Sequence, residues 1–313
     1  MIGEFGLIAR HFRPLAGDGA LDLLDDAALL APPPGRELVL AADTMVAGVH
    51  FLPDDPADTI GAKLLRVNLS DLAAMGATPL AYLMTVSAPR DTPDAWFAAF
   101  AAGLTADQRR FGLSLLGGDT TSTPGPITLS LTILGHVAPG EAVYRLGAQA
   151  DDDLWVSGTI GDGALGLAAL RGEVLDPTGY LTRRYRCPEP RLGLARPELV
   201  AACLDVSDGL VQDTGHLCRA EHLGAVIEAA AVPLSAAAQA AGPRWLETCL
   251  TGGDDYELLM AVRPTLGPAL CAHAERLGLA VTRIGRFVPG QDVQVLTSSG
   301  DLMRLPRSGW SHF

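Results

Sequence analysis

The sequence has few of the features that mark secreted, zinc-binding or nucleic-acid-binding proteins. Its five cysteines are an odd number and include no C-x-x-C pair, which argues against a disulfide framework and a zinc site, so we interpret them as buried packing thiols. The balance of 23 basic and 36 acidic residues gives a net charge of −13. That is the wrong sign for a protein that holds a phosphate backbone, and we expect no nucleic-acid partner.

Lysine is nearly absent, because Lys63 is the only one and the other fixed cations are arginines. The pattern G-x-x-x-x-G-K-[ST] does not occur, which excludes a P-loop kinase. Any phosphate chemistry must therefore rely on arginine, backbone amides or metal ions.

Long hydrophobic runs are also missing. The apolar stretches are broken by proline or acid, and none reaches the roughly 18 strongly apolar residues of a membrane span. The first residues carry an acid at Glu4 and no basic leader before an apolar run. We therefore expect neither a signal nor a transit peptide, no membrane partner, and a cytoplasmic location.

What is present suggests two α/β domains. The 313 residues are 48% hydrophobic, enough for two moderate cores. Residues 37–46 read as a strand and 55–77 as a helix, and strand-like and helix-like segments continue to alternate to the C-terminus. The turn-rich segment 145–153 separates the two halves, so we predict domains over 1–147 and 148–313.

Aspartates recur where apolar segments stop. They are Asp25, Asp26, Asp43, Asp119, Asp205, Asp208, Asp254 and Asp255, and Asp71 lies inside the helix predicted over 55–77. Each alone could be an ordinary turn or N-cap residue. Together, among small and apolar neighbours, they would repel one another and take up protons unless cations are present. Oxygen ligands without soft partners favour Mg²⁺, which proteins hold together with substrate phosphates.

A rival motif is G-x-G-x-x-G, formed by Gly161, Gly163 and Gly166 between a predicted strand and a predicted helix. This is the local context of a dinucleotide-binding turn. The second strand ending in an acid about 20 residues later is missing. We therefore interpret these glycines as helix–strand packing and keep a dinucleotide-dependent oxidoreductase as a lower-ranked alternative.

Five segments in order carry a resemblance to a known family. They are DTMVAGVHF, RVNLSDLAAMGATP, GGDTT, LDVSDGL and TGGDDYELL. The chain resembles the thiamine-monophosphate kinases, which belong to the superfamily of aminoimidazole ribonucleotide synthetase and selenophosphate synthetase. The resemblance implies an ATP- and Mg²⁺-dependent kinase that converts thiamine monophosphate to thiamine diphosphate by direct in-line phosphoryl transfer.

The resemblance also implies an architecture and a set of site residues. The fold would be α/β (α+β) with two domains: an N-terminal α/β domain that binds metal and ATP and forms a homodimer, and a C-terminal α/β domain that closes the nucleotide cleft. No covalent or general-base catalytic residue is expected. The implied ligands of several Mg²⁺ ions are Asp26, Asp43, Asp71, Asp119, Asp205 and Asp208. The implied ATP contacts are Gly118, Asp119, Arg145 and Ser207, and those to thiamine monophosphate are His50, Asp254 and Trp310.

The sequence departs from the family's pattern at four positions. Leu24 replaces the usual glycine before the first aspartate pair, Ala41 and Ala42 replace hydroxyl residues, and Asp254 replaces a glutamate. Two alternatives therefore stay open beside the kinase: another ATP-using member of the superfamily with a different acceptor, and a nucleotide-binding homologue without catalysis.

Overall fold

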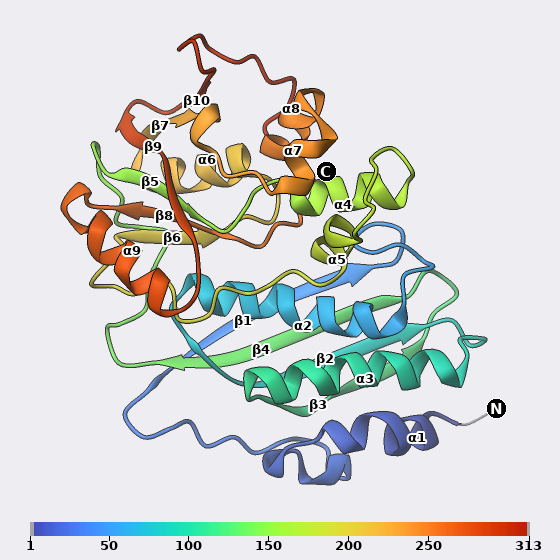
Figure 1. The fold of residues 1–313 in the computed structure, drawn as a ribbon. Helices are drawn as coiled ribbons and strands as arrows, with labels where there is room; N and C mark the ends of the chain where they lie inside the picture. Colours follow the sequence, from blue (N-terminus) through green and yellow to red (C-terminus); the bar gives the residue numbers. More distant parts are fainter. Residues whose placement is uncertain (1–2, 312–313) are drawn as a thin grey trace. The chain divides into compact units, whose positions relative to one another are not determined.

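The structure is a computed structural model that describes residues 3–311. The chain divides into two compact units (Figure 1). Unit 1 runs to Leu72 and again from Ala77 to Gly140, and unit 2 comprises Ala73–Gly76 and the chain from Glu141 onward. Each unit combines helices with one β-sheet, which confirms the predicted α/β class.

Unit 1 is built on a four-stranded sheet in the order β1-β4-β2-β3. The strands are β1 (Glu37–Val46), β2 (Thr78–Ala88), β3 (Ser114–Ser122) and β4 (Thr128–Val137). Only β2 and β3 pair in parallel. Helices α2 (Ala57–Ala74) and α3 (Asp94–Phe111) lie on one face of this sheet (Figure 1). Every second residue of β4, from Leu129 through Leu131 and Ile133, is buried, as expected for a sheet covered on one side.

The opposite face of the unit 1 sheet carries exposed leucines. Leu38 and Leu40 alternate with the buried Val39 on β1, and their exposed fractions are 38% and 59%. On β2, Leu83 is 41% exposed between the buried Tyr82 and Met84. Because side chains on a strand alternate between faces, these leucines lie on the face away from the helices.

The N-terminal segment contains short helices that the sequence pattern did not predict. They are α1 (Glu4–Leu7), η1 (Ile8–Phe12), η2 (Arg13–Leu15) and η3 (Asp18–Leu23). The segment is anchored by the buried Phe12, whose ring lies edge-on to Phe100 of α3 at 6.5 Å between centroids. In η3, Leu21, Asp22 and Leu23 have φ of 51°, 61° and 55°, a left-handed turn that L-residues adopt only under strain.

Unit 2 is built on a six-stranded sheet in the order β10-β7-β9-β5-β8-β6, in which only β10 and β7 pair in parallel. The strands are β5 (Asp153–Ser157), β6 (Ala202–Asp205), β7 (Leu223–Glu228), β8 (Leu258–Val262), β9 (Val281–Pro289) and β10 (Val293–Leu296).

Both faces of the unit 2 sheet are covered. Leu259 of β8 packs in one hydrophobic cluster with Leu217 of α6 (Leu210–Glu221). Its neighbour Met260 packs in a second cluster with Leu270 of α9 (Gly267–Arg276). All five residues of β8 are consequently buried, which explains their continuous apolar run.

A third hydrophobic cluster in unit 2 joins four short helices: α4 (Asp162–Leu170), α5 (Tyr180–Arg186), α7 (Ala236–Ala241) and α8 (Leu246–Thr251). Helices α5 and α8 were not predicted. Three single 3-10 turns, η4 (Ala229–Ala231), η5 (Pro243–Trp245) and η6 (Pro264–Leu266), complete the unit.

The five cysteines are free thiols. Cys203, Cys218 and Cys249 are buried, Cys187 is partly buried and Cys271 is exposed. The interpretation of all five as buried packing thiols is therefore wrong for Cys271. Among the helices of residues 3–311, none is long and apolar enough to cross a membrane.

Candidate active site

In unit 1, the structure brings Asp43 and Asp71 together. Asp43 lies in the middle of β1 and Asp71 in the last turn of α2, and their side chains share a hydrogen bond. Burial raises the pKa of Asp43, and the hydrogen bond with Asp71 partly offsets that rise. Two carboxyl groups in this arrangement must hold either a proton or a cation between them. The pair therefore fits a hard divalent ion.

His50 lies in the turn that follows β1. Its Nδ1 accepts a hydrogen bond from the backbone N–H of Val46 at 3.0 Å, so a neutral imidazole carries its proton on Nε2. The buried Lys63 donates to the backbone carbonyl of His50 at 3.0 Å. These two contacts fix the loop and turn His50 Nε2 into a donor, as a phosphate oxygen requires.

Asp26 and Asp119, the other two implied metal ligands of unit 1, are both exposed. Asp26 is exposed between η3 and β1, where its backbone N–H donates to the Asp25 carboxylate at 3.0 Å. Asp119 is exposed within β3, which continues beyond the apolar segment to Ser122. Since β1 and β3 are the two edges of the sheet, Asp43 and Asp119 lie on strands three spacings apart, about 14 Å.

Gly118 has a structural reason to be glycine. Its φ is +156°, and a Cβ there would come within 1.7 Å of the backbone carbonyl of Met84 on β2. This close approach to β2 is enough to explain the glycine. Leu24, which replaces the family's glycine before the first aspartate pair, has an ordinary φ of −107°. The left-handed turn falls on the three residues before it.

In unit 2, the β6–α6 connection gathers three carboxylates. Asp205 ends β6 and is 7% exposed, and Asp208 follows in the turn. Asp213, in the first turn of α6, accepts the backbone N–H groups of Asp208 and Gly209 at 3.0 and 3.1 Å. Burial raises the pKa of Asp213 to about 7, and the negative charges of Asp205 and Asp208 add to the rise. Because these negative charges repel one another, the group would be stabilised by a bound cation.

Asp208, Asp213 and His216 each offer a ligand atom, and these atoms lie within 4.8 Å of one another. Carboxylate oxygens with an imidazole nitrogen suit a divalent cation. The sequence reasoning missed Asp213 and His216, although their spacing of three residues places them on one face of a helix. Burial lowers the pKa of His216, and the positive charges of Arg219 and Arg145 lower it further, which places Arg145 near this group.

The C-terminal segment is attached to the same turn. The backbone N–H of Trp310 donates to the carbonyl of Asp208 at 3.0 Å. Gln212 Nε2 donates to the carbonyl of Trp310 at 2.5 Å and to Asp208 Oδ2 at 3.3 Å. Trp310 is 49% exposed.

The segment after α8 lies against the β6–α6 turn. The backbone N–H of Asp254 donates to the carbonyl of Ser207 at 2.9 Å. A Cβ on Gly253 would come within 2.2 Å of that same carbonyl, so this position requires glycine. Unit 2 therefore holds Ser207, Asp208, Asp254 and Trp310 in one backbone-linked group.

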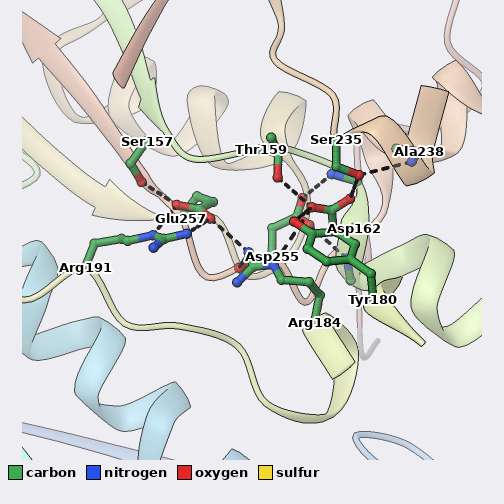
Figure 2. A network of polar contacts seen from close by, with 12 residues as sticks. Ser157, Thr159, Asp162, Tyr180, Arg184, Arg191, Ser235, Ala238, Asp255 and Glu257 are labelled. Atoms are coloured by element: carbon green, nitrogen blue, oxygen red, sulfur yellow. Dashed lines mark hydrogen bonds and ion pairs between the residues drawn. The ribbon is translucent and has the colours of Figure 1, made fainter. Parts of the chain in front are cut away.

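The G-x-G-x-x-G segment binds an internal carboxylate. The N–H groups of Gly161 and Gly163 donate to Asp255 at 2.7 and 3.0 Å (Figure 2). A dinucleotide pyrophosphate would need those same donors, so the basis for a dinucleotide-dependent oxidoreductase is removed. Gly166 packs on the backbone of Leu181 in α5, where a Cβ would come within 2.3 Å of its carbonyl oxygen. The predicted helix–strand packing is in fact helix–helix packing at this glycine.

Further buried charges surround Asp255 (Figure 2). Glu257 accepts from Arg184 at 2.8 Å, from Arg191 at 2.6 Å and from the Ser157 hydroxyl at 2.6 Å. Asp162 accepts from Thr159 at 2.5 Å, from Ser235 at 2.5 Å and from Tyr180 at 3.1 Å. These carboxylates are satisfied by the protein itself and are structural rather than open to a metal.

Comparison with known proteins adds a consistent set of relatives. Residues 24–137 match the AIR synthase related protein N-terminal domain, and residues 149–297 match the corresponding C-terminal domain. The thiamine-monophosphate kinase of Caulobacter vibrioides is 46% identical, with 99% of this chain and 90% of that protein covered.

Two solved structures are similar over nearly the whole chain. The thiamine-monophosphate kinase of Stenotrophomonas maltophilia is 40% identical with a TM-score of 0.85, and 96% of this chain and 98% of that chain are covered. AaThiL complexed with AMPPCP and TMP is 29% identical with a TM-score of 0.78, and 100% of this chain and 97% of that chain are covered.

Proposed function

The chain belongs to the thiamine-monophosphate kinase family, within the AIR synthase related proteins, and on that premise we propose that it phosphorylates thiamine monophosphate with ATP. The products are thiamine diphosphate and ADP. The observation that carries this proposal is the similarity along the entire chain to AaThiL, which was solved with AMPPCP and TMP. Each unit also contains a cluster of carboxylates, and such clusters can hold the divalent cations that phosphoryl transfer needs.

Several Mg²⁺ ions are proposed as cofactors, held by Asp26, Asp43, Asp71, Asp119, Asp205 and Asp208. Support comes from the Asp43–Asp71 hydrogen bond and from the crowding of Asp205 and Asp208 around Asp213, since each arrangement gathers negative charge in a partly buried place. Mg²⁺ held by these residues would neutralise the phosphate charges of both substrates. Ala41 and Ala42 offer only backbone carbonyls, so an ion bound at β1 would depend on Asp43.

The chain's own groups position the substrates. We assign the ATP contacts to Gly118, Asp119, Arg145 and Ser207. The acceptor is already a phosphate and ionised near neutral pH, so no general base is required, and the work is to align the acceptor oxygen with the γ-phosphorus.

For the acceptor, we assign His50, Asp254 and Trp310. His50 Nε2–H is a donor for a phosphate oxygen. The half-exposed Trp310 ring offers a face to the cationic aromatic part of thiamine. Asp254 is one methylene shorter than the family's glutamate, and its carboxylate offers an acceptor to the same substrate.

We further propose a homodimer and a cytoplasmic location, where ATP is available. The N-terminal domain, 1–147, is assigned metal binding, ATP binding and dimerisation, and 148–313 completes the site. Leu38, Leu40 and Leu83 support the dimer, because they form an apolar face on the unit 1 sheet that its helices leave exposed. A second copy with the same face is the simplest partner.

Direct assay of the purified protein tests the function. Incubation with ATP, Mg²⁺ and thiamine monophosphate should give thiamine diphosphate and an equal amount of ADP, and chelation of the metal should stop it. Asp119→Asn and Asp208→Asn should lose nearly all activity, on the order of 100-fold or more. Asp54→Asn, a change at an exposed acid outside the proposed ligand set, should behave as wild type. ADP release with another acceptor but not with thiamine monophosphate would reject the proposed substrate, and wild-type rates in both variants would reject the ligand assignment.

A further inference from the structure

The acceptor-side residue Asp254 has an unusual backbone. Its φ is 69°, and that of Tyr256 is 53°, so two non-glycine residues of one short segment lie in the left-handed region. Non-glycine residues rarely adopt this conformation, and it persists only where the surroundings fix it. The segment between α8 and β8 must therefore be held by strong contacts.

The residue between them supplies those contacts. Asp255 is fully buried and its two carboxylate oxygens accept the N–H groups of Gly161 and Gly163, one each (Figure 2). Gly163 also touches Asp254 itself, since a Cβ there would come within 2.3 Å of the Asp254 carbonyl oxygen. The N-terminus of α4 is thus in contact with Asp254 on one side and bound by Asp255 on the other.

The following residues anchor the segment to the sheet. The carbonyl of Asp255 accepts from Arg184 Nη2 at 3.1 Å, and the same nitrogen donates to Glu257 at 2.8 Å. The backbone N–H of Tyr256 donates to the carbonyl of Val206 at 2.8 Å, next to the β6–α6 turn. Asp254 is partly buried, whereas Asp255 and Glu257 are fully buried.

We propose that Asp255 is a positioning residue for the phosphate acceptor: by binding the Gly161 and Gly163 amides, its carboxylate fixes Asp254 in the left-handed conformation that presents its side chain to thiamine monophosphate. The inference rests on the proposed function for the role of Asp254. It adds that G-x-G-x-x-G serves acceptor recognition through an internal carboxylate instead of binding a nucleotide phosphate.

The first test is Asp255→Asn. The amide keeps one oxygen acceptor and turns an NH₂ donor toward the other glycine N–H, so one of the two contacts is lost with little change in volume. We expect KM for thiamine monophosphate to rise about tenfold. KM for ATP should stay within about twofold, because the change acts on the acceptor side.

A double-mutant cycle separates positioning from general destabilisation. If Asp255 acts through Asp254, then Asp255→Asn should raise KM for thiamine monophosphate much less in an Asp254→Ala background than in wild type. Equal effects in both backgrounds, or parallel rises in KM for both substrates, would overturn the proposal.

Two further variants serve as a control and a second route. Tyr180→Phe removes a hydrogen bond to Asp162 in the same buried network and leaves Asp255 untouched, so both KM values should remain those of wild type. Gly163→Ala forces a Cβ against Asp254 without altering Asp255. It should reproduce the selective rise in KM for thiamine monophosphate, and its failure to do so would count against the proposal even if Asp255→Asn does not fold.

Hydrogen exchange distinguishes failure of this inference from failure of the proposed function. In the full chain without substrates, Asp255→Asn should speed exchange at the amides of Gly161, Gly163 and Asp254 relative to Tyr180→Phe. Faster exchange in a protein that makes no thiamine diphosphate would support the positioning role of Asp255 and reject the proposed kinase activity. Unchanged exchange in an active protein would reject the positioning role alone.

Discussion

Asp255 shows how one buried side chain can carry both structure and charge. It is 0% exposed, and burial raises its pKa to about 8 although the N–H groups of Gly161 and Gly163 lower it. The negative charge of Asp162 raises the pKa further, and Arg184 opposes that effect. The carboxyl group of Asp255 therefore ionises at a higher pH than that of an exposed aspartate.

The pH dependence of stability follows from this shift. Between the unfolded pKa near 4 and the folded value of about 8, the folded state binds more protons than the unfolded state. The stabilisation from Asp255 is therefore fully present below the unfolded pKa and is lost as pH rises through the folded pKa. Asp255→Asn removes this titration. We expect the free energy of unfolding, measured by urea denaturation, to fall as pH rises from about 5 to about 8. The total fall should be smaller in the variant than in wild type, by about a few kcal/mol. Identical slopes would show that Asp255 does not titrate in this range.

At the scale of elements, the strands and the longer helices were largely predictable, whereas several short helices were not. The strand predicted over 37–46 has the same bounds as β1. The helix predicted over 55–77 is α2, which is shorter than predicted at both ends. Helices α5 and α8 have seven and six residues, too few for a period of 3.6 to be read. They are held by packing, such as that of Gly166 on Leu181, that no local pattern encodes.

The candidate site was predictable to the same degree. Side chains such as Asp43 and Asp71 could be named from motifs, and the structure joins them. The role of Asp213 could not be named, because it depends on which way the N–H groups of Asp208 and Gly209 point after folding. Sequence patterns report the types of side chains, whereas this part of the site depends on the orientation of backbone N–H groups.

The C-terminal segment gives a prediction at the scale of an element. Gln212 ties Trp310 to Asp208 through two hydrogen bonds, and Gln212→Ala removes both. The loss, on the order of 1 kcal/mol, should raise KM for thiamine monophosphate roughly fivefold and speed amide exchange at Trp310. Gln239→Ala, which removes a glutamine contact to the Leu234 carbonyl elsewhere in unit 2, should change neither quantity. Normal exchange at Trp310 in Gln212→Ala would show that the segment is held by other contacts.

At the scale of the whole molecule, the proposed homodimer would bury the apolar face of the unit 1 sheet. Leu40 is 59% exposed on that face, and a charge there would have to be buried in a dimer. We expect light scattering to give twice the chain mass for wild type and the chain mass for Leu40→Glu. Leu175→Glu, at a leucine that is 92% exposed in unit 2, should remain dimeric. A monomeric wild type would refute the proposed homodimer.

The buried Lys63 has a practical consequence for anyone who wishes to label or tether this protein. Its ammonium group is the only lysine amine in the chain, is 2% exposed and is engaged by the His50 carbonyl. Acylating reagents directed at lysine should therefore leave the Lys63 side chain of the folded protein unmodified, and reaction at Lys63 would report opening of the loop that carries His50. The exposed thiol of Cys271 is the natural handle for a dye or a surface.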